Sequence, residues 1–384
     1  MGKGFQDEAA MTSSQDIDIR DPDFVESLNE LIRRAGGNPE NHAGRLLRET
    51  MQNCLRLARD QVDLGEVKIL SYAFREMRHA FSVFRPYRDV PKISVFGSAR
   101  TVEHKAQYQA ALDFSRHISQ AGWMVITGAG DGIMRAGHGG AGRDASFGVA
   151  IRLPFETNAN EFIIGDDKLV THRYFFTRKL MFVSQANAVA LFPGGFGTLD
   201  EGFEVLTLVQ TGKSAPMPIV CVDEPGGDYW HHFDRYIREQ LLTDGMIDEA
   251  DLSLYHITDN TAEAVEHVLA FYRNYHSWRW VGDELVLRLR QAPDAAQLDR
   301  LNADFADLLN EGRIEPCTPF DVEDDARDLA RLKLRFNRRS HGRLRQMIDQ
   351  INSFIAPDAA EAASARARPG RSELPGGGPE ATAS

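Results

Sequence analysis

An apolar segment at residues 188–192 runs directly into a glycine-rich stretch, Pro-Gly-Gly-Phe-Gly-Thr-Leu-Asp-Glu, at residues 193–201. A buried strand that ends at a glycine turn and restarts as a helix is typical of α/β folds. It leaves free backbone N–H groups at the carboxyl end of the strand, where anions bind. The sequence therefore predicts a phosphate cradle formed by Gly194, Gly195, Gly197 and Thr198.

Glu201 follows this cradle closely in the sequence. We expect it in the first turn of the new helix, where the helix dipole keeps a carboxylate ionised beside the bound ligand. A site that only holds phosphate favours cations, so a carboxylate at this place indicates chemistry. Glu201 is therefore a candidate catalytic residue.

Apolar strand-like and amphipathic helix-like segments alternate over residues 92–275. The expected strands are residues 93–97, 123–127, 147–151, 188–192, 218–222 and 254–257. The expected helices are residues 105–121, 174–182, 198–210, 229–242 and 261–275, and a further helix that the glycine-rich residues 128–132 open and that runs to residue 141. Such alternation predicts the α/β class, with a doubly wound parallel sheet (Rossmann-like) covered by helices on both faces.

The segments on either side of this domain have different patterns. Helical periodicity predicts a helical N-terminal extension over residues 21–91, and a mixed pattern predicts a small α+β C-terminal module over residues 276–356. In that module we expect a strand at 284–289 and helices at 294–310 and 324–354. Residues 1–20 and 357–384 are predicted to be a disordered N-terminus and a disordered tail, because they have little apolar surface to bury.

Composition narrows the classes of partner. The chain has 384 residues and a formal net charge of −12, which disfavours nucleic acid. A run of basic residues over 331–345 is interpreted as a solvated helix face, because apolar residues interleave with it at helical spacing. The N-terminus has no apolar signal segment, so we expect a cytoplasmic protein without membrane contact. Three widely spaced cysteines and no His-Glu-x-x-His motif predict no metal site.

Two further glycine elements follow predicted strands and are expected at the same sheet edge. They contribute Gly97 and Ser98, and Gly130 and Gly132, as candidate substrate-binding residues. A nicotinamide fingerprint is an alternative, but Ile133 occupies its third glycine position and the motif follows the second strand. A Walker A phosphate loop, which needs a further glycine five positions before the glycine of a Gly-Lys-Ser or Gly-Lys-Thr, is absent from the sequence. A mononucleotide is therefore the expected ligand.

Arg178 and Lys179 precede the strand that enters the main glycine motif. Together with residues 193–201, they resemble the paired motifs of the LOG (lonely guy) family, P-G-G-x-G-T-x-x-E with an upstream Arg-Lys. The likeness spans about residues 92–275. Phe175 stands where small plant-type members carry Met, and the flanking segments resemble the longer bacterial forms.

The resemblance implies hydrolysis of a nucleoside 5'-monophosphate, AMP-like or a cytokinin riboside monophosphate, to free base and ribose 5-phosphate. In longer forms, a common nucleotide such as AMP is the expected substrate. The resemblance assigns catalysis to Arg178 and Glu201, substrate binding to Lys179 and the glycine loops, and a homodimeric assembly. It implies no cofactor, although the family was long labelled a possible lysine decarboxylase. Whether Arg178 serves the phosphate or the base stays open.

The residues also support this chemistry, because cleavage of a ribosyl C–N bond passes through an oxocarbenium-like state that a carboxylate stabilises. The alternative is a non-catalytic nucleotide or cofactor carrier or sensor on the same fold. A carrier has no need to keep the pair of Arg178 and Glu201, so the pair discriminates between the two hypotheses.

Overall fold

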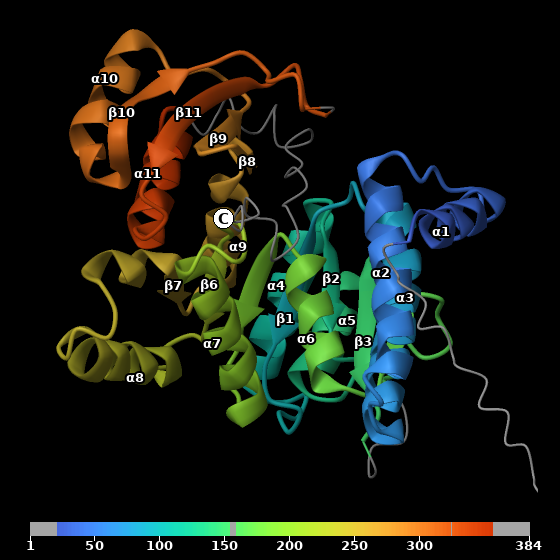
Figure 1. The fold of residues 1–384 in the computed structure, drawn as a ribbon. Coiled ribbons are helices and arrows are strands. Elements are labelled where there is room, and N and C mark those ends of the chain that lie inside the picture. The colour runs from blue at the N-terminus through green and yellow to red at the C-terminus, as the bar shows by residue number, and fades with distance from the viewer. Residues whose placement is uncertain (1–20, 154–158, 324, 356–384) are drawn as a thin grey trace, which may run out of the picture. The chain divides into compact units, whose positions relative to one another are not determined.

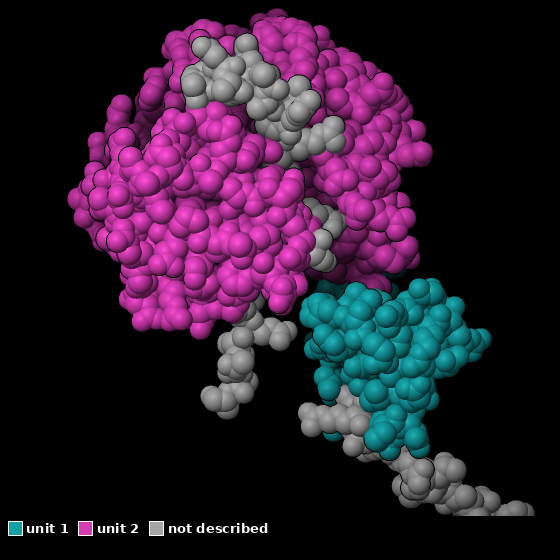
Figure 2. Space-filling view, turned by 90° about the horizontal axis from the view of Figure 1, so that it is seen from above, with its two compact units in different colours: residues 1–72 teal, residues 73–384 magenta. Residues whose placement is uncertain are grey.

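A computed structural model describes residues 21–153, 159–323 and 325–355. The chain divides into two compact units, residues 1–72 and 73–384 (Figure 2). The two segments predicted to be disordered, 1–20 and 357–384, lie outside the described residues.

The smaller unit is helical, as the periodicity predicts. It contains α1 (Pro22–Arg34), α2 (His42–Arg59) and the first part of α3 (Leu64–Phe84). Asp21 caps α1 by accepting hydrogen bonds from the backbone N–H groups of Asp23 and Phe24, and Asn41 caps α2 in the same way. The rest of α3 belongs to the larger unit and is followed by a 3-10 turn (Arg85–Tyr87).

The larger unit is built on a parallel sheet of seven strands in the order β4-β3-β2-β1-β5-β6-β7. The strands are β1 (Lys92–Phe96), β2 (Met124–Thr127), β3 (Ser146–Ile151), β4 (Leu169–His172), β5 (Ala188–Leu191), β6 (Ile219–Val222) and β7 (Tyr255–Thr258). The chain reverses its direction of strand addition between β1 and β5. In such sheets ligands bind at this reversal, beyond the carboxyl ends of the strands.

Helices cover both faces of the sheet (Figure 1). They are α4 (Ala106–Gln120), α5 (Ile133–Ala141), α6 (Phe175–Ser184), α7 (Phe196–Gln210), α8 (Tyr229–Tyr236), which continues as a π-helical turn (Ile237–Leu242), and α9 (Thr261–Phe271). In β5, Ala188 and Ala190 face one apolar core, with α4, α5 and α9, while Val189 and Leu191 face a second core with α3, α6, α7 and α8. This alternation follows from the two-residue period of a strand. The predicted doubly wound α/β fold is confirmed.

The C-terminal module is a separate antiparallel sheet of four strands in the order β10-β11-β9-β8. It consists of β8 (Tyr275–Val281), β9 (Glu284–Leu289), β10 (Leu309–Pro316) and β11 (Ala330–Phe336), with α10 (Ala295–Asp304), α11 (His341–Ser353) and a 3-10 turn (Ala306–Leu308) before β10. Another 3-10 segment (Glu249–Leu254) leads into β7 of the parallel sheet. Its apolar side chains join the core that contains α4, α5 and α9. The module is therefore packed onto the parallel sheet.

Several predicted elements are wrong in this module. The helix expected over 324–354 is a strand, β11, followed by α11. The helix expected at 294–310 ends at Asp304 and is followed by a 3-10 turn and β10, and the helix expected at 261–275, before the module, ends at Phe271. In β11 the buried residues Leu332, Leu334 and Phe336 alternate with more exposed ones, which is a strand period. The Asn337 side chain accepts the N–H groups of Arg339 and Ser340 and makes the turn into α11. β4 was also absent from the prediction.

The basic run over 331–345 is not a solvated helix face. Arg331 lies on β11 and is buried, as is Arg345 on α11. Arg331 and Arg288 both pair with the buried carboxylate of Glu323, at 3.0 and 2.6 Å. Burial alone raises the pKa of Glu323, but the Phe320 N–H and the two guanidinium groups outweigh it and bring that pKa to about 2. These arginines hold the module together.

Candidate functional site

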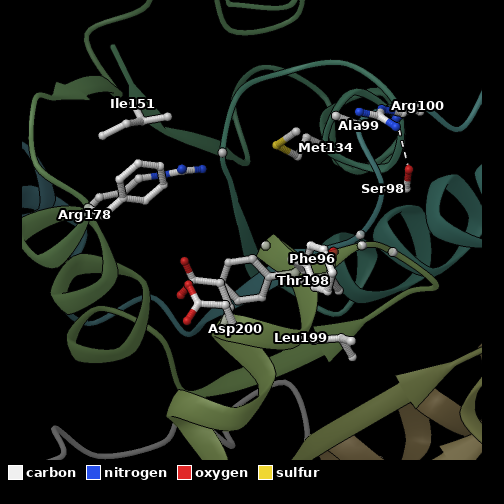
Figure 3. Close-up of a pocket in the computed structure, with 18 of the residues that line it drawn as sticks. Phe96, Ser98, Ala99, Arg100, Met134, Ile151, Arg178, Thr198, Leu199 and Asp200 are labelled. Atoms are coloured by element: carbon white, nitrogen blue, oxygen red, sulfur yellow. Dashed lines mark hydrogen bonds between the residues drawn. The ribbon is translucent and has the colours of Figure 1, made fainter. Parts of the chain in front are cut away.

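A pocket of about 820 Å³ opens beyond the carboxyl ends of β1 and β5. It lies where the order of strand addition reverses, and its volume is in the range of about 300–1,000 Å³ usual for ligand pockets. The described residues that line it are Phe96, Gly97, Ser98, Ala99, Arg100, Gly128, Met134, Ile151, Leu153, Phe175, Arg178 and residues 194–201. In Figure 3, Arg178 lies at the left of the pocket, Ser98 at the right, and Thr198 and Leu199 below.

The loop after β1 forms one wall through Gly97 and Ser98. The N–H of Ser98 donates to the carbonyl of Pro193 at 3.1 Å, and its carbonyl accepts from the N–H of Ile133 at 3.0 Å. Its hydroxyl accepts from the N–H of Arg100 at 3.1 Å. Ser98 therefore ties the ends of β1 and β5 to the start of α5, as expected for elements that meet at one sheet edge.

The main glycine loop makes the floor and leads into α7. Gly195 is the N-cap residue of α7 and supplies no capping side chain, so the first N–H groups of the helix have no acceptor within it. A Cβ added at Gly195 or Gly197 meets no protein atom within 4 Å. Internal packing thus gives no reason for glycine at either position, whereas a ligand that approaches the backbone does.

Two side chains fix the shape of this loop. A Cβ at Gly194 would collide with the hydroxyl of Thr198, so the Thr198 side chain lies directly against the loop. The Tyr229 hydroxyl donates to the carbonyl of Gly194 at 2.6 Å. The arrangement presents backbone N–H groups and one hydroxyl toward the pocket, which suits an anion.

Arg178 enters the pocket from α6. Its Nε donates to the carbonyl of Val149, at the end of β3, at 3.0 Å, and its guanidinium lies 5.2 Å from the ring centre of Phe182. A Cβ at Gly128 would collide with Nη2 of Arg178. The side chain is therefore fixed between β3, the loop after β2 and its own helix.

Glu201 lines the same pocket and is only 6% exposed, with Oε2 buried and without a hydrogen-bond partner among the described residues. Burial raises the pKa of Glu201 to about 7, although Lys179 and Arg178 oppose the shift. The expectation of a carboxylate kept ionised in the first helical turn is wrong, because α7 begins at Phe196 and Glu201 lies in its second turn. The helix dipole acts mainly within the first turn, so burial dominates.

Three residues predicted to bind substrate do not line the pocket. Lys179 pairs with Asp200 at 2.8 Å and with Glu204 at 2.9 Å. Gly130 is half-buried, and its carbonyl accepts from the Asn160 amide at 2.9 Å. Gly132 has φ +64°, and a Cβ there would collide with the backbone of Ser98 and Ala99, so its glycine is required by the fold.

The apolar wall of the pocket was not predicted as part of the site. It consists of Phe96, Met134, Ile151, Leu153 and Phe175. Phe96 and Ile151 are the last residues of strands β1 and β3, so the predicted strand ends could have identified them as pocket residues. Met134 and Phe175 lie on helices, and only the packing of α5 and α6 brings them to the pocket. An apolar wall beside an anion cradle is the combination that a nucleotide base and its phosphate require.

Across the described ranges, no group of three or more His, Cys, Asp or Glu side chains is placed to hold a metal ion. The same ranges contain no helix with the length and hydropathy needed to cross a bilayer.

Comparison with known proteins finds relatives for this part of the chain. A probable cytokinin riboside 5'-monophosphate phosphoribohydrolase of Oryza sativa subsp. japonica is 26% identical over 180 residues, which cover 45% of this chain and 74% of the relative. A cytokinin riboside 5'-monophosphate phosphoribohydrolase of Mycobacterium tuberculosis is 26% identical over 170 residues, covering 44% and 88%. Among solved structures, the molybdenum cofactor carrier protein of Chlamydomonas reinhardtii aligns at 22% identity and a TM-score of 0.33, over 47% of this chain and 99% of that one.

The family described as "Possible lysine decarboxylase" matches residues 131–268, a range that includes Arg178 and the whole glycine motif. This description is the label that the LOG family long carried. The resemblance of this chain to the LOG family is therefore confirmed, and it lies in the parallel-sheet part of the chain.

Proposed function

We propose that the protein hydrolyses the N-glycosidic bond of a nucleoside 5'-monophosphate and releases the free base and ribose 5-phosphate. The observation that carries the proposal is that Arg178 and Glu201, from separate segments, line one pocket together with the glycine loop. The named relatives are phosphoribohydrolases, which supports this class of reaction.

The proposed binding mode places the 5'-phosphate on the loop from Gly194 to Thr198. Backbone N–H groups at the start of α7 and the Thr198 hydroxyl donate to its oxygens. The base then lies along the apolar wall, where Met134 and Ile151 contribute. This arrangement leaves the ribose between the loop and Glu201.

The proposed chemistry requires Glu201 as a carboxylate. Positive charge develops at C1' and the ring oxygen as the C–N bond breaks, and a nearby carboxylate stabilises it. The same carboxylate polarises the attacking water, whose oxygen bonds to C1' while a proton goes to the departing base. Arg178 keeps its positive charge and orients either the phosphate or the base.

The test is incubation of the purified protein with AMP, CMP, GMP, UMP and isopentenyladenosine monophosphate, with chromatography of base and ribose 5-phosphate. We expect base and ribose 5-phosphate in equal amounts from at least one nucleotide, with AMP as the first candidate. Binding of AMP by calorimetry without release of base from any nucleotide contradicts the proposal and supports a carrier or sensor.

A further inference from the structure

Glu76, near the middle of α3, contacts the start of the helix that carries Arg178. Its carboxylate accepts the N–H of Arg173 at 3.0 Å and the hydroxyl of Thr177 at 2.8 Å. The N-cap residue of α6 is Tyr174, which makes no side-chain capping bond. Glu76 therefore ties α3 to the residue just before the N-cap of α6 and to a side chain in its first turn. It also places a negative charge beside the N-terminus of α6, where the helix dipole favours one.

His172, the last residue of β4, completes this contact. Its Nδ1 lies 3.2 Å from the Thr177 hydroxyl and 3.7 Å from the Glu76 carboxylate. Burial lowers the pKa of His172. The Thr177 hydroxyl is placed to donate to Glu76, and the carbonyl of Tyr174 lies 2.9 Å from the same hydroxyl oxygen. His172 and Thr177 are both fully buried, and 12% of the Glu76 side chain is exposed. The three side chains thus form a largely buried polar link.

This link lies next to the pocket. Thr177 is adjacent in sequence to Arg178, and His172 pairs in register with Ile151, which lines the pocket. Arg178 needs the correct placement of α6, because its Nε must reach the carbonyl of Val149 on β3. An error of about 1 Å in such a group costs on the order of 100-fold in rate.

We propose that Glu76 is a positioning residue, which anchors the start of α6 and so places the Arg178 guanidinium over the pocket. The inference rests on the proposed function and adds to it a role for α3, which precedes the parallel sheet in the chain. Glu76 itself is not among the pocket-lining residues described above. Its effect on the reaction passes through Arg178.

A double-mutant cycle tests this route. Glu76→Gln keeps the size of the side chain but removes its charge, and we expect about a tenfold loss of kcat/KM for AMP in the otherwise native protein. In an Arg178→Lys background, where the guanidinium fork is absent, the same change costs less than about twofold. Equal factors in both backgrounds, or no loss in either, overturn the proposal.

Variants of Thr177 and Glu66 provide the controls. Thr177→Val removes the hydroxyl and is expected to lower kcat/KM as Glu76→Gln does. Thr177→Ser retains the hydroxyl and is expected to keep kcat/KM close to that of the native protein. Glu66→Gln makes the same chemical change on the same helix, where the carboxylate accepts from the N–H of Asp63 at 3.0 Å, and leaves kcat/KM unchanged. A loss of rate with Glu66→Gln equal to that with Glu76→Gln contradicts a specific role for Glu76.

Hydrogen exchange separates this proposal from the proposed function. Glu76→Gln is expected to speed exchange of the amides of residues 174–178, and Glu66→Gln is not. This measurement needs no turnover. A native protein that releases no base contradicts the proposed function alone, while unchanged exchange in Glu76→Gln contradicts the anchoring of α6.

Discussion

Glu201 shows how one residue acquires a property that its neighbours in sequence do not give. Glu201 lies in the second turn of α7 and is almost fully buried. Burial raises its pKa, and the positive charges of Lys179 and Arg178 oppose this rise only in part. The result is a group with a pKa of about 7, so both protonation states are populated near neutral pH. General acid–base catalysis is most effective with a group of this kind.

Glu201→Gln tests this residue most directly. We expect kcat to fall by about 10²–10⁴-fold, because the amide neither stabilises positive charge nor accepts a proton. The affinity for AMP, measured by calorimetry, stays within about threefold. Glu239→Gln, an exposed carboxyl group on the π-helical turn after α8, is the matched control and keeps full rate. Unchanged turnover in Glu201→Gln removes this residue from catalysis.

The raised pKa of Glu201 also predicts how the rate and the stability of the native protein and of Glu201→Gln depend on pH. Because the carboxylate is the active form, kcat/KM rises with pH and levels off above about 7. Stability has the opposite sign: the folded pKa is above the unfolded value of 4.5, so stability falls as pH rises from about 4.5 to 7. At pH 8, Glu201→Gln therefore raises the free energy of unfolding, by at most about 3 kcal/mol. Urea unfolding of both proteins at pH 5 and pH 8 measures the difference.

At the scale of elements, the turn between β5 and α7 leaves space for a ligand beside its backbone. A Cβ at Gly195 or Gly197 meets only open space, so the fold tolerates alanine at both positions. Neither glycine has a positive φ, which removes backbone strain as a reason for their presence.

Gly195→Ala and Gly197→Ala are therefore expected to weaken AMP binding without loss of stability. A methyl group at either position stands between the backbone N–H groups and the phosphate. Since hydrogen bonds to charged groups contribute about 1.5–3 kcal/mol, KM rises by about 10- to 100-fold. The thermal unfolding midpoint, measured by calorimetry, stays unchanged. An unaltered KM in both variants contradicts phosphate binding by this loop.

The success of the sequence prediction differs between elements for a physical reason. The strands of the parallel sheet are short and mostly apolar runs, and the sequence predicts all of them except β4, in which Thr171 and His172 put a polar side chain on each face. In the C-terminal module, Leu332, Leu334 and Phe336 precede Leu344, Met347 and Ile348, and the combined spacing fits one long helix. Only the pairing of β11 with β9 and β10 decides in favour of a strand.

At the scale of the whole molecule, large aromatic side chains remain uncovered on α6 and α7, the helices that carry Arg178 and Glu201. Phe196, at the start of α7, is 94% exposed, and Phe175, Phe176 and Phe203 are exposed as well. Exposed aromatic groups of this size often mark a protein–protein interface. The homodimer that the family resemblance implies is our proposal for what covers them.

Light scattering on a sizing column tests that assembly. We expect a mass near twice the 42.9 kDa of one chain. Phe203→Glu introduces a charge on the exposed side of α7 and shifts the mass toward that of the monomer, because a buried unpaired charge costs several kcal/mol. Val322→Glu, at an exposed apolar position of the C-terminal module, leaves the mass unchanged. A monomeric native protein contradicts the proposal.

The sequence by itself determined the doubly wound sheet, the glycine loop at its edge and the candidates Arg178 and Glu201, because strand runs, glycine turns and motif spacing are local properties of the chain. The tertiary structure decided what these residues are once folded. Burial, not the helix dipole, sets the pKa of Glu201. Lys179 forms ion pairs with Asp200 and Glu204. Glu76, about 100 positions before Arg178, became relevant only through packing, since contacts between distant segments depend on how α3 and α6 lie against one sheet.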